Sequence, residues 1–109
     1  MAGMERVGDV KELARLFKAL SDETRLRLLK LLADRGPEGA LCVGALAEKL
    51  GVTQSAVSQH LAVLRAAGLV VDERRGYFVH YRLNRANLGR WRERMRATLG
   101  EELAQVLAE

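Results

Sequence analysis

The sequence predicts a mainly α-helical fold with a small β-hairpin, in the α+β class, with about five helices and two strands. Apolar residues recur at helical spacing over most of the chain. Two short stretches, at residues 69–71 and 78–83, instead contain β-branched and aromatic residues, which favour strands. With 109 residues, 49% of them hydrophobic, the chain can bury one modest core. We therefore expect a single domain over residues 1–109.

Two helices are predicted in the first third of the chain. Asp9 and Glu12 have the spacing of a capping box, and apolar residues follow at helical intervals as far as Leu20. Ser21 is placed to cap a second helix. The Gly-Pro-Glu-Gly segment at 36–39 is expected to end that helix.

Residues 43–67 have the pattern of two helices joined by a tight turn. The first helix is expected to end at Gly51, a residue that tolerates a left-handed backbone. Thr53 is placed to cap the second helix, and Ala47 is small enough for the two helices to approach closely. The pattern predicts a helix-turn-helix.

The second helix of this pair, residues 54–67, has two different faces. At about 100° per residue, Val57, Leu61 and Leu64 point the same way and should face inward. The opposite face lacks the Lys and Glu of an ordinary solvated helix, and its short polar side chains could hydrogen bond in a DNA major groove. Gln59 is the best candidate base reader. The full set of candidate DNA-binding residues is Thr53, Gln54, Ser55, Ser58, Gln59, Arg65, Arg74 and Arg75.

A hairpin is expected at about residues 69–83, with its tip at Arg74, Arg75 and Gly76. The net charge is +4, and residues 65–96 hold nine arginines against three acidic residues. Arginine suits both phosphates and guanine edges, so we expect the hairpin to serve as a wing that contacts DNA. The alternative is a charged turn that only keeps the protein soluble.

One long C-terminal helix is expected over about residues 85–107, capped by Asn84. Its apolar stripe is longer than a small domain covers from one side, so we expect a homodimer in which the first and last helices pack across a two-fold axis. Burial of the stripe within one subunit is the alternative. The expected interface residues are Val10, Leu13, Phe17, Leu88, Trp91, Met95, Leu99 and Leu103.

Four segments carry a resemblance to a known family: FKALSDETR at 17–25, SAVSQHLAVLR at 55–65, AGL at 67–69 and RGYFVHY at 75–81. Between about residues 13 and 83 the chain resembles the ArsR/SmtB (arsenical-resistance repressor) family. The resemblance implies a dimeric winged helix-turn-helix repressor that leaves its operator when an inducer binds. We expect the homodimer to bind an inverted-repeat operator in double-stranded DNA. The resemblance does not identify the inducer.

Metal-sensing members of that family typically carry a Cys-Val-Cys segment, or Asp and His ligands on the last helix. Here Cys42 is the only thiol, Gly44 stands at the second position, and the last predicted helix has neither His nor Asp. A soft metal needs about three or four ligands, so we expect no metal site and no cofactor. Cys42 is either a packed small residue or a redox thiol. His60 and His80 are expected to be structural.

Three further expectations concern the class of protein. The sequence has no glycine-rich phosphate loop, no nucleophile motif with a partnered base and no paired carboxylates in a plausible cleft. We therefore expect that the protein is not an enzyme. It has no apolar run of membrane-spanning length and no signal-like start, so we expect a cytoplasmic protein without a membrane partner. A redox-responsive repressor that uses Cys42, and a winged-helix interaction module without DNA binding, are the alternative functions.

Overall fold

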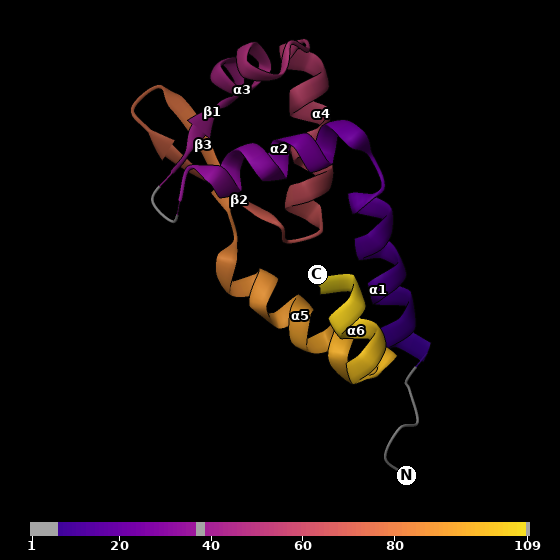
Figure 1. The fold of residues 1–109 in the computed structure, drawn as a ribbon. Helices are drawn as coiled ribbons and strands as arrows, with labels where there is room; N and C mark the ends of the chain where they lie inside the picture. The colour runs from indigo at the N-terminus through magenta and orange to yellow at the C-terminus, as the bar shows by residue number, and fades with distance from the viewer. Residues whose placement is uncertain (1–6, 37–38, 109) are drawn as a thin grey trace.

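The computed structural model describes residues 7–36 and 39–108, and it is mainly helical with one small antiparallel sheet (Figure 1). In chain order the elements are α1 (Val7–Leu20), α2 (Glu23–Asp34), β1 (Leu41–Cys42), α3 (Val43–Leu50), α4 (Gln54–Ala66), β2 (Val70–Arg75), β3 (Phe78–Leu83), α5 (Arg85–Leu99) and α6 (Glu101–Ala108). The predicted α+β fold is confirmed. The described residues form one more helix and one more strand than the sequence predicted.

The connection between α3 and α4 follows the prediction closely. Helix α3 ends at Gly51, whose φ of 68° is left-handed, and the Gly51 N–H donates to the Ala47 carbonyl. Thr53 caps α4, because its side-chain oxygen accepts from the Ala56 N–H at 3.1 Å. Helix α4 ends at Ala66, one residue before the predicted end.

The helix starts near the N-terminus differ from the prediction. Asp22, not Ser21, caps α2, since the Asp22 carboxylate accepts from the Arg25 N–H at 3.0 Å. The Ser21 hydroxyl instead donates to the Lys18 carbonyl at the end of α1. Helix α1 is already formed at Val7, so Asp9 lies in its first turn rather than at its cap. The error at α2 arises because Ser21 and Asp22 can each serve as a cap and only the backbone decides between them.

The sheet has the strand order β1-β3-β2. In the β2–β3 hairpin, Arg75 pairs with Phe78, so Arg74 and Arg75 end the strand and the turn lies at Gly76 and Tyr77. The predicted tip was therefore one residue too early. Strand β1 was not predicted, because two residues carry no periodic signal. It pairs with β3 through Leu41 and Cys42.

The predicted single C-terminal helix is two helices. Gly100, with a φ of 91°, ends α5, and α6 folds back beside it (Figure 1). Glycine adopts this backbone without steric cost. Glu101 and Glu102 then occupy the first turn of α6, where acidic side chains are favourable.

The core lies between the helix-turn-helix, the first two helices and the sheet. The α4 residues Val57, Leu61 and Leu64 are at most 1% exposed, which confirms the predicted inward face. Leucines of the other elements complete the core, including Leu28 and Leu46 at 0% exposed. Within the described residues, no helix has both the length and the apolar character needed to cross a membrane.

Candidate nucleic-acid interface

The outer face of α4 is solvent-exposed at the end of the molecule away from α5 and α6 (Figure 1). Gln54, Ser55, Ser58 and Gln59 are all exposed there. Every one of these side chains can donate or accept hydrogen bonds, and none is charged. The structure thus exposes four of the five α4 members of the predicted set in the first half of the helix, with Thr53 at the helix start and Arg65 in the last turn.

The N-terminus of α4 is electrostatically suited to an anion. Its first turn contains no acidic residue, so the partial positive charge of the helix end is not neutralised from within. The first backbone N–H groups of a helix lack partners within it and can bind a phosphate. Among them, the Ala56 N–H already donates to Thr53.

The arginines of the predicted DNA-binding set differ in whether they form an ion pair within the chain. Arg75 forms an ion pair with Glu73, its Nε lying 3.0 Å from the carboxylate oxygen, and Arg65 lies 3.2 Å from Asp72. Arg74 is exposed and has no ion pair with another described residue. Of the two arginines at the end of β2, Arg74 is therefore the one whose charge is not already matched.

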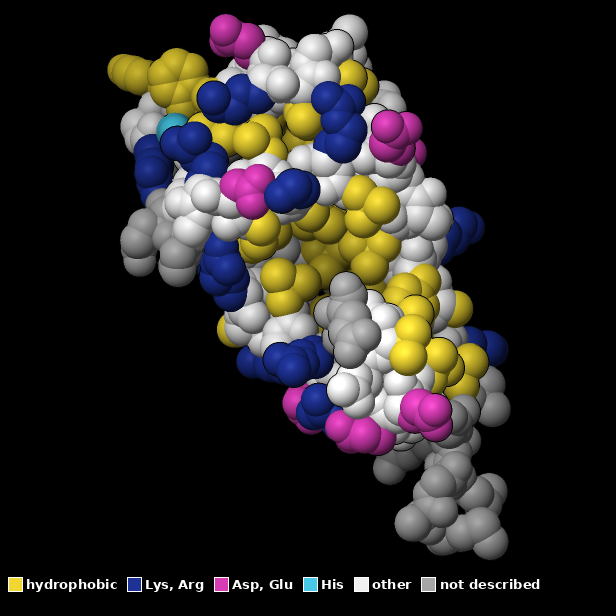
Figure 2. Space-filling model, viewed as in Figure 1, with side chains coloured by type: hydrophobic (Ala, Val, Ile, Leu, Met, Phe, Trp, Pro, Cys, Tyr) yellow, Lys and Arg dark blue, Asp and Glu magenta, His cyan; other side chains and the backbone are white. Residues whose placement is uncertain are grey.

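Two aromatic side chains at the wing tip were not predicted. Tyr77 is 97% exposed and Phe78 is 62% exposed. Figure 2 shows hydrophobic side chains projecting beyond Lys and Arg side chains at the upper left, the part of the molecule in which Figure 1 draws the hairpin. Two consecutive aromatic residues directly after the turn glycine are the sequence signal that could have drawn attention to them.

His60 links α4 to the start of α2. Arg25 Nη1 lies 3.3 Å from His60 Nδ1, and His60 Nδ1 lies 3.9 Å from an Asp22 carboxylate oxygen. The hydrogen bond from the Arg25 N–H, helped by the nearby His60 and Arg25 charges, holds the pKa of Asp22 below its ordinary value of 3.8. These contacts place His60 in the framework that positions α4.

Comparison with known proteins identifies the family. The family described as "Bacterial regulatory protein, arsR family" matches residues 22–71. The arsenical resistance operon repressor of Escherichia coli is 48% identical over 69 residues, which are 63% of this chain and 56% of that protein. The HTH-type transcriptional regulator CmtR of Mycobacterium tuberculosis is 45% identical over 96 residues, covering 88% of this chain and 72% of that protein. The chain belongs to the ArsR family.

A solved structure supports the architecture of this ArsR-family chain. The homodimeric winged helix-turn-helix DNA-binding domain of a possible ArsR-family regulator from Mycobacterium bovis superposes with a TM-score of 0.70 at 31% identity. The match covers 99% of this chain and 90% of that one. The predicted winged helix-turn-helix is confirmed. By contrast, the chain spans little more than half the length of the E. coli repressor, with 56% covered.

The ArsR-family chain places its single thiol beside the sheet. Cys42 is half-buried in β1, directly before α3, and pairs in register with His80 of β3. Within residues 7–36 and 39–108, no three or more His, Cys, Asp or Glu side chains cluster as a metal ion would require.

Most of the expected dimer residues of this ArsR-family chain pack within the chain itself. Leu13 is 3% exposed in the core, and Phe17 packs partly buried against it. The α5 stripe does the same, through Leu88, Trp91, Met95 and Leu99. Val10, at 45% exposed, and Leu103, at 47%, remain on the surface.

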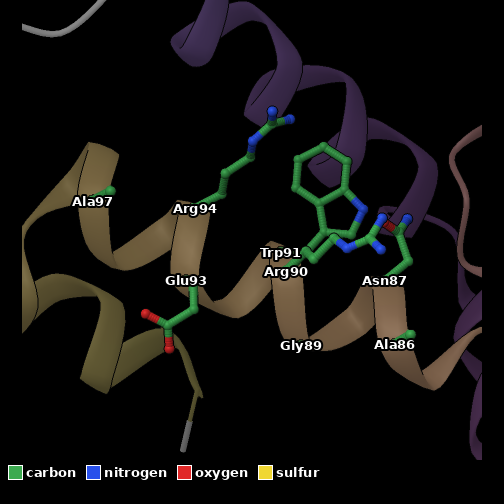
Figure 3. Close-up of a pocket in the computed structure, with 8 residues that line it drawn as sticks. All are labelled: Ala86, Asn87, Gly89, Arg90, Trp91, Glu93, Arg94 and Ala97. Carbon is green, nitrogen blue, oxygen red and sulfur yellow. The ribbon is translucent and has the colours of Figure 1, made fainter.

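The opposite face of α5 borders a hollow of about 770 Å³ (Figure 3). Figure 3 shows Trp91 and Arg94 pointing toward α1 and Glu93 pointing away from it. Arg94 forms an ion pair with Glu12 of α1 at 2.7 Å and lies over the Trp91 ring, 5.5 Å from its centroid. The face that carries Glu93 also carries Ala86, Gly89, Arg90 and Ala97, all of them exposed.

Proposed function

We propose that this chain is a transcriptional repressor that binds an inverted-repeat operator as a homodimer, through residues 53–67 and the wing of one domain. The observation that carries the proposal is the exposed, uncharged, hydrogen-bonding face of α4, whose N-terminus contains no acidic residue. Membership of the ArsR family and the homodimeric DNA-binding domain from M. bovis support it.

The side chains divide into two groups by role. Ser55, Ser58 and Gln59 would read base edges in the major groove, where a glutamine amide can pair with adenine. Gln54, the N-terminus of α4 and Arg74 would hold phosphates, which sets position but not sequence. Arg65 and Arg75 would contribute less, because each already has a carboxylate partner.

DNA binding is tested by selecting fragments of the source genome on the purified protein and measuring their affinity by fluorescence anisotropy. We expect enriched fragments to share an inverted repeat with half-sites about one helical turn apart. We also expect salt-dependent affinity for random duplex DNA at low salt, caused by counterion release. An interaction module would show neither, and that result would overturn the proposal.

The exposed face of α5 is suited to a second copy of the chain. At about 100° per residue, Ala86, Gly89, Arg90, Glu93 and Ala97 lie within about 60° of one direction, opposite the apolar stripe. If two α5 helices pack antiparallel about a two-fold axis between residues 91 and 92, each Ala86 meets the partner's Ala97. Each Arg90 then meets the partner's Glu93. The small residues permit close approach and the charges are complementary.

This register makes the dimer sensitive to charge reversal. Arg90→Glu or Glu93→Arg would place like charges together twice in each dimer, and we expect the dimer Kd to rise about tenfold to a hundredfold. The double variant restores opposite charges and should recover the parent Kd. Glu93 also pairs with Arg96 at 2.8 Å, but both are solvent-accessible, so that pair is readily exchanged.

Sedimentation equilibrium measures these constants, and Arg92→Glu is the matched control. Arg92 is exposed on the same helix but about 120° away from the proposed contact face. Rescue of the dimer by the double variant, with no effect of the control, supports the register. If both single variants weaken the dimer and the double variant does not recover the parent Kd, the proposed register is excluded.

A further inference from the structure

A groove of about 470 Å³ lies between α1, α2 and the second half of α4. Its floor is apolar and is formed by Ala19, Val63, Ala66 and Ala67. Val63 is 40% exposed, so the groove leaves apolar surface of the reading helix open to solvent. This surface lies in the second half of α4, after Gln54, Ser55, Ser58 and Gln59, the side chains proposed to contact bases and phosphates.

Three cations border the groove: Arg15 and Lys18 on α1, and Arg25 on α2. None of the described residues that line the groove is acidic. Neither Arg15 nor Lys18 forms an ion pair with any described residue. An apolar floor with charges of one sign at its edge complements a ligand that has an apolar body and an anionic end.

A smaller hollow of about 210 Å³ continues the groove toward α5. The two share Arg15, Ala66 and Ala67, and the smaller one reaches Trp91, the only tryptophan in the sequence. A ligand that fills the groove would therefore change the surroundings of a single fluorescent side chain.

Arg25 connects the groove to the proposed DNA-reading helix. Its Nε donates to the Ala19 carbonyl, and Nη2 donates to the Lys18 carbonyl at 3.3 Å, both at the end of α1. Its Nη1 lies 3.3 Å from His60 of α4. An anion bound to Arg25 would compete with this contact between α2 and α4.

We propose that this groove binds an organic anion with an apolar body and one carboxylate, and that binding lowers the affinity of the protein for DNA. The second half of this statement rests on the proposed function, whereas the first does not. The carboxylate pairs with Lys18 and Arg25 while the apolar body lies between α1 and α4. Because α4 would read DNA, a ligand that moves α4 relative to α1 changes DNA affinity, and DNA must change ligand affinity by the same factor.

The groove would stay accessible in the proposed dimer. The proposed contact uses the exposed face of α5 that carries Arg90 and Glu93, and none of the described residues that line the groove belongs to α5. The ligand would thus act on the relation between α1 and α4 without having to displace the partner.

Binding is measured first on the full chain without DNA. Octanoate and 1-naphthoate are the anionic probes, and 1-octanol and acetate test the charge and the apolar body separately. We expect both anionic probes to give saturable binding by calorimetry, and octanoate to change the Trp91 fluorescence as well. Acetate should not bind, and octanol should bind at least about threefold more weakly than octanoate. Equal binding of octanol and octanoate, or no binding of either carboxylate, would overturn the proposal.

Variants then locate the site. Val63→Glu places a carboxylate on the groove floor and should abolish octanoate binding, while Arg15→Gln with Lys18→Gln should weaken it about three- to tenfold. Lys11→Gln is the matched control, because Lys11 is an exposed cation on the same helix outside the groove. Circular dichroism and sedimentation confirm that each variant keeps its fold and oligomeric state. Octanoate binding that is unchanged in both groove variants would exclude this site.

The DNA arm uses the operator fragment found by selection. Saturating octanoate should weaken operator binding by the parent at least about fivefold and leave Val63→Glu unaffected. If octanoate binds but operator affinity does not change, the regulatory half of the proposal is wrong. If no DNA binds at any salt concentration while octanoate still does, the proposed function fails and the ligand site stands. If Arg15→Gln with Lys18→Gln instead weakens DNA binding and leaves octanoate binding intact, the cations serve phosphates and the anion site is excluded.

Discussion

Replacing Arg74 by alanine should make DNA binding less sensitive to salt. Arg74, at the end of β2, has no ion pair among the described residues, whereas Arg75 beside it is held by Glu73. A dimer carries two copies of Arg74, so the variant loses two phosphate contacts, and the slope of log K against log salt should fall by about 1.8. Between 50 and 200 mM salt, the parent should therefore lose about twelvefold more affinity than the variant.

Fluorescence anisotropy across this salt range, on both operator and random duplex, measures the two slopes. The loss should be similar for both DNAs, because a phosphate contact does not depend on sequence. Arg92→Ala on α5 is the control for a change in total charge, and its slope should stay near that of the parent. A slope for Arg74→Ala within about 0.5 of the parent value would show that the wing does not contact phosphate in this way.

Other predictions test the reading face, the core and the α2 cap. Gln59→Ala should lower discrimination between the preferred and a mismatched base pair by about 1–3 kcal/mol in competition binding, with affinity for random DNA nearly unchanged; retained discrimination would remove Gln59 as a base reader. Leu61→Ala, at a position 1% exposed, should lower the free energy of unfolding in urea by about 2–5 kcal/mol, and a loss well under 1 kcal/mol would contradict the packing. The lowered pKa of Asp22 means that its charged form stabilises the fold above pH 3.8 and that this contribution disappears as the pH falls through the depressed folded value. Asp22→Asn keeps a capping oxygen but should remove this acid dependence, so the stability difference between parent and variant should shrink toward low pH; a constant difference would contradict it.

The parts of the fold that were predicted correctly have strong local signals. Gly51 and Thr53 mark the turn between α3 and α4 because each residue type has its own backbone preference there. The inward face of α4 follows from helical periodicity alone. These signals depend on a few neighbouring residues, and distant contacts do not override them.

The features that were missed depend on contacts between distant residues or on choices between neighbours. Strand β1 exists because β3 pairs with it, and nothing within Leu41 and Cys42 indicates this. Gly100 interrupts an apolar pattern that otherwise continues to the C-terminus, so the break and the folding back of α6 were overlooked. The ion pairs of Arg65 and Arg75 depend on side-chain rotamers and on the hairpin register. For that reason, the number of arginines can be read from the sequence, but it cannot be read from the sequence which of them form ion pairs with acidic side chains.

Strand β1 has a mechanical consequence for how any signal could act. It joins the start of α3 to the central strand of the sheet, so the wing is tied at its base to the first helix of the helix-turn-helix. Helix α3 and the wing should then move together as one rigid unit. In a repressor made of two such subunits, a signal would change the distance and the angle between the two rigid units and would leave the structure of each unit unchanged. The major groove of B-DNA recurs about every 34 Å along one face of the duplex. A small change in the distance between the two rigid units would therefore prevent both of them from entering successive grooves.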